Sequence, residues 1–415
     1  MLCMSSESLE EFYGQILGFE WPWEVQEIIR DGTLREVRVI AGYADGEEAH
    51  CPTCGKPAAI HDRKTRRWRH LDSCNHKTII ESDIPRVKCQ EHGVLQIKVP
   101  WAEKNSRFTL ELERHVCRWL QMASISEVGS MFDLGWDAVA GIQERAVRRG
   151  LAKRKKASPR NIGVDETSFQ KRHEYVTVIL DKDTNTVLDV LQDRKAKTLG
   201  AWFGTQEMAD LKDLESISMD MWDPFIKAAK QHFENWESLI AFDRYHVAQH
   251  LNKAVDKVRA QEHRELIKEH GASDLSGTKF DWLRTSTKTD NRTGNRPTFM
   301  QLSRLNLRTA RAWRIKEAAT LLWNYSYLGV AEKRWKELLS WISRSKLEPM
   351  VKAGKMIRSY FWGILNAIRL KVSNAMLEAV NSGIQRIKRM ACGFRNRERF
   401  RMAILFHFGG LDFGF

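Results

Sequence analysis

The sequence lacks the features that place a chain in a membrane or in an oxidising compartment. No apolar run approaches the roughly 20 residues that a helix needs to cross a bilayer. The first residues, Met-Leu-Cys-Met-Ser-Ser-Glu, have no basic flank followed by an apolar stretch, so they do not predict a signal peptide. The cysteine count is seven, an odd number that argues against a disulfide framework. We therefore expect a cytoplasmic protein that does not contact a membrane.

Acidic residues are also in short supply, and there is no internal repeat or low-complexity tract. The formal net charge is +14, because 67 Lys and Arg residues outnumber 53 Asp and Glu residues. A basic surface attracts a polyanion, and nucleic acid is the commonest one. The alternative is a dispersed charge that only keeps the protein soluble. The 415 residues predict two to four domains with well-formed cores.

The chain divides into segments of different composition. Residues 1–45 are expected to be a short lead-in with a half-buried strand over 34–39, where apolar and polar residues alternate. Residues 46–100 form a module that contains cysteine and histidine, and 101–152 are helical in pattern. A basic linker over 153–160 follows and ends near a proline. Its cations could contact phosphate or simply be solvated; they are Lys153, Arg154, Lys155 and Lys156.

Two pairs of potential metal ligands lie in the second segment. The predicted ligands are Cys51, Cys54, Cys89 and His92. Tetrahedral zinc needs four such ligands, and two closely spaced pairs supply them; Gly55 is a usual turn residue after Cys-x-x-Cys. Strand-like segments at 68–71 and 78–88 could fill the gap between the pairs as a hairpin. The alternative is a coincidence of cysteines. A site with four protein ligands is closed, so the predicted role of zinc is structural. Less favoured ligands are His70, Cys74 and His76.

Three helices are expected after Phe108, over 110–122, 126–132 and 137–149. A helix, a short helix, a glycine-containing turn and a longer helix form the helix-turn-helix pattern, although many small bundles look alike in sequence. The third helix ends in cations that are candidates for DNA contact: Arg145, Arg148 and Arg149.

After the linker the pattern alternates between strands and helices. The expected strands are 162–165, 175–180, 186–191, 217–220 and 239–243, with helices over 196–213 and 224–236. Three strands, a helix, a strand, a helix and a strand is the order of an RNase H-like fold. Residues 247–372 are helical in pattern and rich in tryptophan, with a loop over 271–297. A last helix is expected over 374–390.

Three of these strands end in a carboxylate: Asp165, Asp220 and Asp243. Strand ends form the functional edge of an open α/β sheet, so we expect the carboxylates to lie close together. Unpaired anions would repel one another, and divalent cations relieve that repulsion. Two such ions can activate an attacking oxygen and stabilise a leaving oxygen at a phosphodiester, and magnesium suits this role. Glu166 is a rival carboxylate, but strand alternation directs it away from Asp165.

Glu378, on the last expected helix, is a candidate for a third metal-binding carboxylate. Helical spacing places Ser382, Gln385 and Arg389 on its face, with Lys388 at the edge, a combination suited to contacting phosphate. The alternative is a solvent-exposed glutamate on a basic helix, and the residues alone favour that alternative.

The order of short segments along nearly the whole chain resembles bacterial insertion-sequence transposases of the ISL3 family, which have a DDE catalytic core. The segments include 51–54, 68–72, 85–93, 99–103, 106–109, 163–168, 218–221, 242–247, 374–382 and 391–395. The resemblance implies a multidomain α+β protein: a zinc module, a helix-turn-helix, and an RNase H-like core in two parts, 161–246 and 373–415, interrupted by an all-helical insertion over 247–372. One departure is Ala379, where relatives often have glycine.

The resemblance also implies roles for individual residues. Asp165, Asp220 and Glu378 would be the catalytic triad that holds Mg²⁺ or Mn²⁺. Asp243 and His246 match an Asp-x-x-His signature and would support the triad, although the strand pattern alone leaves Asp243 as a rival for the second catalytic aspartate. Lys388 and Arg389 would join the other cations in contacting DNA.

The implied activity is metal-dependent cleavage of terminal inverted repeats and strand transfer into target DNA. The implied partners are double-stranded DNA and further copies of the chain, in a dimer or larger assembly at the nucleoid. The insertion's tryptophans could stack on unpaired bases, although core packing is the favoured interpretation. Two alternatives remain: a structure-specific endonuclease of related fold, and a DNA-binding regulator with an inert core.

Overall fold

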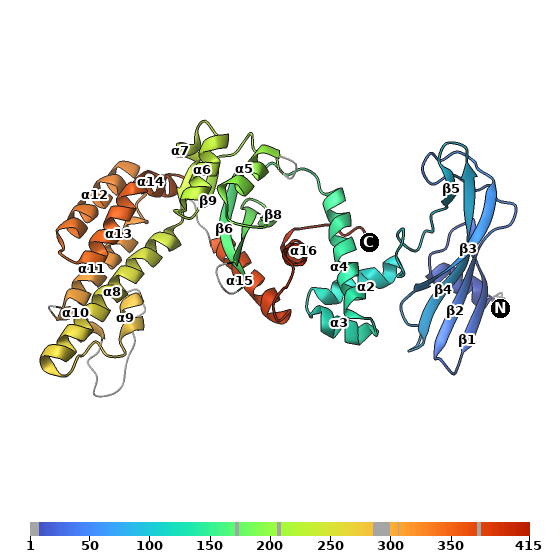
Figure 1. The fold of residues 1–415 in the computed structure, drawn as a ribbon, viewed down its shortest axis with the longest axis horizontal. Coiled ribbons are helices and arrows are strands. Elements are labelled where there is room, and N and C mark those ends of the chain that lie inside the picture. Colours follow the sequence, from blue (N-terminus) through green and yellow to red (C-terminus); the bar gives the residue numbers. More distant parts are fainter. Residues whose placement is uncertain (1–7, 171–173, 206–208, 285–298, 306, 372–374) are drawn as a thin grey trace, which may run out of the picture. The chain divides into compact units, whose positions relative to one another are not determined.

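The structure is a computed structural model that divides into two compact units (Figure 1). It describes residues 8–170, 174–205, 209–284, 299–305, 307–371 and 375–415. Unit 1 comprises Met1–Lys153 with Asp412–Phe415, and unit 2 comprises Arg154–Leu411. Among the described helices, none is both long enough and apolar enough to span a membrane.

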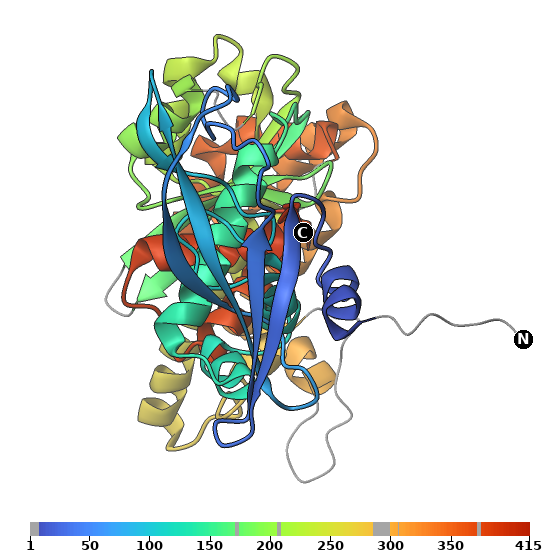
Figure 2. The same cartoon turned by 90° about the vertical axis from the view of Figure 1, so that its right-hand side faces the viewer.

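Unit 1 begins with a short helix and a five-stranded sheet. The elements are α1 (Leu9–Ile16), β1 (Trp23–Asp31), β2 (Glu36–Tyr43), β3 (Ile60–Arg69), β4 (Lys77–Cys89) and β5 (Gly93–Gln96). The order is β1-β2-β4-β3, with β5 paired to β4 (Figure 2). β3 and β4 form the predicted antiparallel hairpin. Three tryptophans, Trp23, Trp68 and Trp101, pack edge to face in the core beneath it.

The segment predicted as a separate lead-in, 1–45, is part of this sheet. β2 starts two residues later than the predicted strand, because residues 32–35 form a turn in which Arg35 has a φ of 50°. From there the expected alternation continues, and Val37, Val39 and Ala41 are buried. β2 pairs in parallel with β4, so the lead-in and the cysteine-containing strands share one core.

Three helices complete unit 1: α2 (Leu110–Leu120), α3 (Ile125–Phe132) and α4 (Trp136–Lys153). Thr109 caps α2, and Ser124 forms a capping box with Glu127 at the start of α3. Gly129 permits the close turn into α4, because a Cβ there would lie 2.7 Å from the carbonyl oxygen of Leu134. The three predicted helices are confirmed, and α4 extends four residues further than expected.

Unit 2 is built on a mixed five-stranded sheet. The elements are β6 (Asn161–Gln170), β7 (Glu174–Asp181), β8 (Thr186–Leu191), α5 (Ala196–Thr205), β9 (Ser216–Met219), α6 (Asp223–His232), α7 (Trp236–Leu239) and β10 (Ile240–Phe242). The strand order is β10-β9-β6-β7-β8, in which β6, β7 and β8 are antiparallel and β6, β9 and β10 are parallel. All five strands were predicted.

Two predicted helices and one predicted strand differ in length. The helix expected over 196–213 is observed to Thr205; residues 206–208 lie outside the described residues, and Ala209 makes a bridge with Ala157. The helix expected to reach residue 236 stops at His232. β6 continues five residues beyond Asp165, because its pairing with β7 persists to Gln170. Asp165 therefore lies in the middle of a strand and not at its end.

A group of helices follows β10. They are α8 (Arg244–His270), α9 (Lys279–Leu283), α10 (Phe299–Arg304), α11 (Arg308–Leu322), α12 (Leu328–Arg344), α13 (Glu348–Ser359) and α14 (Phe361–Arg369). The loop expected over 271–297 contains α9, and its residues 285–297 lie outside the described ones. Trp282 and Trp335 are fully buried, as core packing predicts, whereas Trp341 is 43% exposed.

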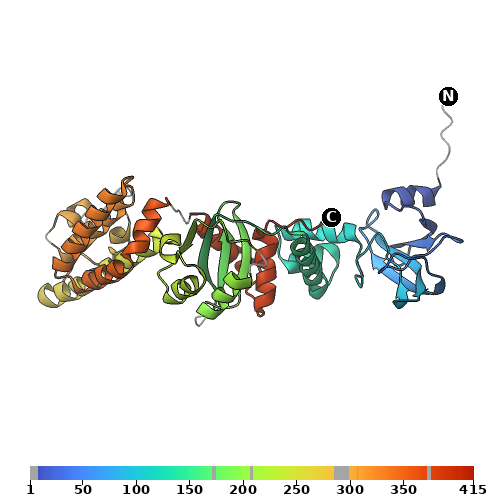
Figure 3. The ribbon, with the colours of Figure 1, turned by 90° about the horizontal axis from the view of Figure 1, so that it is seen from above.

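The helical group is joined to the sheet through α14. The side chain of Asn366 donates to the carbonyl oxygen of Ile240 at 2.9 Å. Gly363 allows the contact, since a Cβ would lie 2.4 Å from the ring of Phe242. The chain then returns to the sheet: α15 (Ala375–Met390) packs on β6 and α16 (Arg397–Phe408) on β8. Figure 3 shows red helices of this C-terminal segment beside the green strands of unit 2.

Candidate functional site

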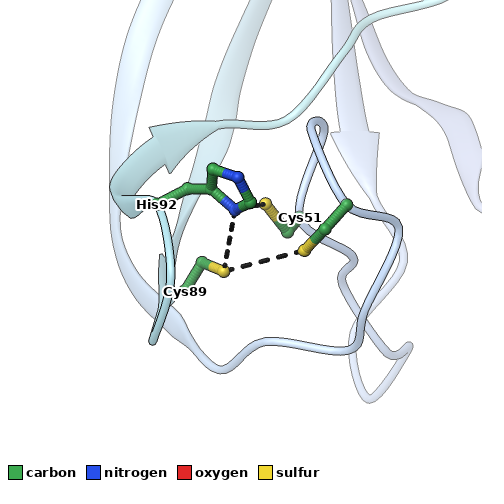
Figure 4. A group of neighbouring side chains, drawn as sticks. Cys51, Cys89 and His92 are labelled. Carbon is green, nitrogen blue, oxygen red and sulfur yellow. Dashed lines mark hydrogen bonds between the residues drawn. The ribbon is translucent and has the colours of Figure 1, made fainter.

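The four predicted zinc ligands meet at one end of the sheet in unit 1, and we call them the Cys/His cluster. Cys51 and Cys54 lie in a turn before β3, Cys89 ends β4, and His92 lies in the turn to β5 (Figure 4). Their ligand atoms all lie within 4.8 Å of one another. The Sγ of Cys89 is 3.5 Å from Nδ1 of His92 and 3.8 Å from Sγ of Cys54.

The electrostatics of the Cys/His cluster fit a bound dication. A hydrogen bond from His92, with backbone N–H groups, lowers the pKa of Cys89 to about 6. A backbone hydrogen bond lowers the pKa of Cys54, but burial and the neighbouring thiols Cys51 and Cys89 outweigh it and raise that pKa. Crowded thiols of this kind are stabilised as thiolates by zinc. The donor set and spacing therefore fit a structural zinc ion.

The three less favoured ligands lie apart from this cluster. His70 shares a hydrogen bond with Thr109 Oγ1 at 2.9 Å, and burial lowers its pKa to about 4. His76 Nδ1 lies 3.1 Å from the carbonyl oxygen of Cys74, and Cys74 is exposed. None of the three belongs to the group of ligand atoms described above.

In unit 2, the three predicted aspartates come from neighbouring strands. Asp165 lies within β6, Asp220 directly follows β9, and Asp243 directly follows β10. β6, β9 and β10 are adjacent and parallel. Val164 pairs with Met219 and Met219 with Phe242, so the aspartates that follow these residues lie level with one another. Asp243 also caps α8 by accepting from the backbone N–H of Tyr245 at 2.9 Å. Strand order therefore explains why residues 78 positions apart in the sequence (243 − 165) lie together.

The imidazole of His246 joins the three aspartates. Its Nε2 lies 3.9 Å from Asp165 Oδ1 and 3.8 Å from Asp243 Oδ2, and its Nδ1 lies 3.5 Å from Asp220 Oδ2. His246 is in the first turn of α8, and its side chain is 20% exposed. A single imidazole that contacts three carboxylates cannot neutralise all of them.

Asp165 has the most perturbed acidity of the group. Burial, helped by repulsion from Asp220 and Asp243, raises its pKa to about 6, against the opposing effects of His246 and the Glu166 backbone N–H. That N–H donates to Oδ1 at 2.7 Å, and the amide of Asn381 donates to Oδ2 at 2.6 Å. Asp165 therefore has polar partners on both oxygens but no strong cation.

Glu378 lies in the first turn of α15, close to the same carboxylates. Glu378 is exposed; partial desolvation raises its pKa, repulsion from Asp243 adds to the increase, and His246 opposes it. Glu378 and Asp243 both line a cavity of about 620 Å³ between α8, the end of α11 and the start of α15. We call Asp165, Asp220, Asp243, Glu378 and His246 together the acidic centre.

One face of α15 contacts β6 in register. Asn381 binds Asp165, Gln385 Nε2 donates to Thr167 Oγ1 at 2.8 Å, and Lys388 Nζ donates to the Ser168 carbonyl oxygen at 2.7 Å. The predicted face included Gln385 and, at its edge, Lys388, whereas Ser382 and Arg389 of that face are exposed. Sequence reasoning did not assign Asn381 a contact; its position three residues after Glu378 was the available signal.

The rival carboxylate Glu166 has a partner of its own. Its Oε2 pairs with Arg194 at 3.1 Å. The Arg194 guanidinium stacks 4.6 Å from the ring of Tyr175 and 4.8 Å from that of Trp222. This arrangement agrees with the expectation that Glu166 is directed away from Asp165.

The oxygen donors of the acidic centre are those that a hard cation such as Mg²⁺ prefers. In the part of the chain that the structure describes, the Cys/His cluster is the only group of three or more ligands whose atoms all lie within 4.8 Å. The aspartates of the acidic centre surround the imidazole of His246 and are more widely spaced than the ligands of the Cys/His cluster. Their oxygen atoms make them candidates for holding divalent cations.

The candidate DNA-binding cations fall into two groups. Four have internal partners: Arg145 and Arg149 pair with Glu113, Arg154 donates to carbonyl oxygens of β8, and Lys388 binds Ser168. These internal contacts occupy some of their donors, and the role of these four residues in DNA binding stays a prediction. The exposed candidates are Arg148, Lys153, Lys155, Lys156 and Arg389. Arg148 keeps 68% of its side chain exposed although it pairs with Glu144.

Comparison with known proteins gives three matches in order along the chain. Residues 47–92 match the zinc-finger of transposase IS204/IS1001/IS1096/IS1165, residues 97–147 match the helix-turn-helix domain of transposase family ISL3, and residues 162–404 match the transposase model of the same family. The chain is 23% identical to the transposase for insertion sequence element IS1001 of Bordetella parapertussis, over 87% of this chain and 89% of the relative. It is 25% identical to the transposase for IS1557 of Mycobacterium tuberculosis (strain H37Rv), over 83% and 82%.

Proposed function

Because the chain belongs to the ISL3 family of insertion-sequence transposases, we propose that Asp165, Asp220 and Glu378 form a DDE centre for DNA cleavage and strand transfer. The observation that carries this proposal is the convergence of three aspartates on His246. Glu378 lies beside the same cavity as Asp243.

The proposed core is RNase H-like. Its support is the strand order β10-β9-β6-β7-β8, with three antiparallel strands followed by two parallel ones. The helices α8 to α14 lie between the third aspartate and α15 in sequence, as an insertion would. The insertion leaves the site intact because α15 returns to β6 and brings Glu378 with it.

The cation proposed for the acidic centre is Mg²⁺ or Mn²⁺, held by Asp165, Asp220 and Glu378. When bound, such ions polarise the phosphodiester and stabilise charge on the attacking and leaving oxygens. Asn381 and the Glu166 backbone N–H fix the orientation of the Asp165 carboxylate. Asp243 anchors the first turn of α8 and thereby positions His246, so both are supporting residues.

The proposed reaction has two steps that balance without a covalent protein–DNA bond. Water attacks a phosphodiester at the element's end, so that one P–O bond forms and the bond to the 3′ oxygen breaks. The freed 3′-hydroxyl then attacks a phosphodiester of the target, forming a new P–O bond and releasing the target's 3′ oxygen. The alternative of a structure-specific endonuclease lacks the second step, and the alternative of a DNA-binding regulator lacks both steps.

We propose that unit 1 recognises terminal inverted repeats in double-stranded DNA. The helix-turn-helix would contact a groove of the DNA. Exposed Arg148 and Lys153 in unit 1 would contact phosphates, as would Lys155, Lys156 and Arg389 in unit 2. Zinc in the Cys/His cluster would hold the turns that carry its ligands. Pairing of two element ends requires at least two copies of the chain, so we propose a homodimer or larger assembly on DNA.

A donor plasmid with both element ends and a target plasmid test the proposed function. With Mg²⁺ or Mn²⁺, cleavage at the ends and joined donor–target products are expected. Cleavage without joining would favour a structure-specific endonuclease. Binding without metal-dependent cleavage would instead favour a regulator.

Metal analysis of the purified protein tests the structural zinc separately. About one zinc ion per chain is expected, and the Cys54→Ser variant should lose it, because three ligands hold zinc far less tightly than four. The Cys74→Ser variant is the control, since Cys74 is exposed outside the cluster. Equal zinc content in all three proteins would refute the ligand assignment.

A further inference from the structure

A basic row of side chains runs along α8 away from the acidic centre. His246 contacts the three aspartates, and His250, Lys253 and Lys257 follow it at helical spacing. His250 is close enough to Asp220 that the carboxylate opposes the effect of burial on its pKa, which is lowered overall. The row therefore begins at the acidic centre itself.

The acidic residues of α8 lie on another side of the helix. Asp256 pairs with Arg259 at 2.8 Å and with Lys279 of the α9 helix at 3.2 Å. Glu262 accepts from the backbone at the start of α11, and Glu265 pairs with Arg308. These carboxylates are used in packing against α9 and α11. The acidic residues of α8 therefore do not neutralise the positive charges of the basic row.

The basic row forms one wall of a groove, and α13 forms the other. The groove has a volume of about 440 Å³ and includes His250, Lys253, Lys257, Gln261, Lys352 and Met356. Glu348, the acidic residue that lines the groove, pairs with Lys352 at 2.6 Å. Lys253 donates only to Gln249 at 2.9 Å, and within the described residues Lys257 has no ion pair.

The second wall of the groove also reaches the acidic centre. Tyr360, which follows α13, donates from its hydroxyl to Asp223 Oδ1 at 2.7 Å. Asp223 lies three residues after Asp220 and begins α6. Both walls of the groove therefore begin near the carboxylates of the acidic centre.

The basic row is long enough to contact several phosphates. Lys257 lies 11 residues after His246 (257 − 246), about 16 Å along the helix axis; along the axis of a DNA duplex this length spans roughly five phosphates of one strand.

We propose that this α8/α13 groove binds the phosphate backbone of the DNA strand that enters the acidic centre, with Lys253 and Lys257 as phosphate contacts. The inference rests on the proposed function and adds a DNA path on the helical group, which the zinc and helix-turn-helix modules do not provide. Phosphate is the expected ligand because the row offers flexible ammonium groups at short intervals and no pocket for a base edge.

The test is the salt dependence of binding to an end-containing DNA duplex, measured with the full chain. In Lys253→Glu/Lys257→Glu, the slope of log K against log salt should fall by about 2, one for each lost phosphate contact. Affinity at 0.2 M salt should fall roughly tenfold or more. Lys333→Glu/Lys336→Glu on α12, which lines no part of the groove, has the same change in net charge and should keep the wild-type slope.

An unchanged slope in the groove variant, or an equal loss in the α12 variant, would overturn the groove proposal. If charge reversal unfolds the chain, Lys253→Gln/Lys257→Gln should still reduce the slope. Cleavage by the wild-type protein is measured in the same series. A wild type that cleaves while the groove variant keeps its slope refutes only the groove. A wild type that binds without cleaving refutes the proposed function, and the slope still decides whether the groove contacts DNA.

Discussion

The fold treats two carboxylates in opposite ways: Glu113 in unit 1 is fully buried, and Asp165 in unit 2 is partly buried, with 22% of its side chain exposed. The side chain of Glu113 is fully buried and accepts from Arg145 at 2.5 Å, from Arg149 at 2.8 Å and from Ser106 at 3.1 Å. Burial disfavours the charge on Arg149, but its hydrogen bonds to Glu103 and Glu113 outweigh burial and raise its pKa. The anion is thus fully compensated by residues of its own unit.

Asp165 lacks such compensation. The nearest basic side chain is the imidazole of His246, 3.9 Å away, which also contacts two other aspartates, and desolvation of the partly buried carboxyl raises its pKa to about 6. We propose that this difference distinguishes a structural carboxylate from a metal-binding one. Where the fold supplies positive charge, the carboxylate is compensated internally; where it does not, a divalent cation can supply the charge.

The largest expected effect comes from Asp165→Asn, which removes the charge and keeps the shape. Metal-dependent cleavage should fall by roughly a thousandfold or more, because a metal ligand is lost. The metal-free protein should be as stable as wild type or more so, since repulsion with Asp220 and Asp243 is relieved. Gel assays of end cleavage and thermal unfolding without added Mg²⁺ measure the two effects.

The other two proposed ligands should behave alike in that assay. Asp220→Ala and Glu378→Gln should each abolish cleavage and leave DNA binding and zinc content unchanged. A fully active variant would remove that residue from the triad. A marked loss of stability in Asp165→Asn would show that Asp165 is a structural carboxylate and would break the comparison.

Glu113→Gln should have the reverse outcome. It leaves the partly buried Arg145 without its anion and Arg149 with only Glu103, a change that costs about 3 kcal/mol in the free energy of unfolding. Denaturant unfolding of the full chain, followed by hydrogen exchange in α2 and α4, reports the loss in unit 1. The control is Glu111→Gln on the same helix, where the exposed pair with Arg114 contributes less than about 1 kcal/mol. Equal stability of the two variants would contradict the structural role of Glu113.

The sequence predicted the order of the elements better than their contacts. Every strand of the unit 2 sheet was expected because apolar runs rich in β-formers are local features. The placement of Asp165 at a strand end was wrong, because hydrogen bonding to β7 extends β6 beyond it. The end of a strand depends on its partner strand, which the local sequence does not show. Arg145 and Arg149 were expected to contact DNA. Their pairing with Glu113 could not be predicted, because it depends on the packing of α2 against α4. The cysteine spacing, by contrast, predicted a real cluster, because four soft ligands in two close pairs have few other uses.

Glu262 is another buried carboxylate, and the start of a helix compensates its negative charge. It accepts from the backbone N–H groups of Arg308 and Thr309, both at 2.8 Å, at the start of α11. Glu262→Gln should lower the free energy of unfolding by about 2 kcal/mol, through weaker hydrogen bonds and a lost interaction with the helix dipole. Glu265→Gln, at an exposed position one turn away, is the control and should change stability by less than about 1 kcal/mol. An effect no larger than that control would show that the helix end does not compensate the buried charge.

The smallest expected effect tests how Asp165 is positioned. Asn381→Ala removes the amide that donates to Asp165 Oδ2, and loss of such a contact to a metal ligand typically costs 10–100-fold in metal affinity or activity. The Mg²⁺ concentration for half-maximal cleavage should therefore rise, and saturating Mg²⁺ should restore much of the rate. Ser382→Ala, at the next and exposed position, should leave both quantities unchanged.

The metal dependence separates the two roles that Asn381 could have. If Asn381 only packs α15 against β6, its loss lowers stability and leaves the Mg²⁺ requirement as it was. If it positions the carboxylate, the Mg²⁺ requirement rises even where the unfolding midpoint is unchanged. The second result would mean that the fold orients Asp165 with a neutral amide, whereas it neutralises Glu113 with two guanidinium groups. A neutral partner fixes geometry and leaves the negative charge available to the ion, which a catalytic carboxylate requires.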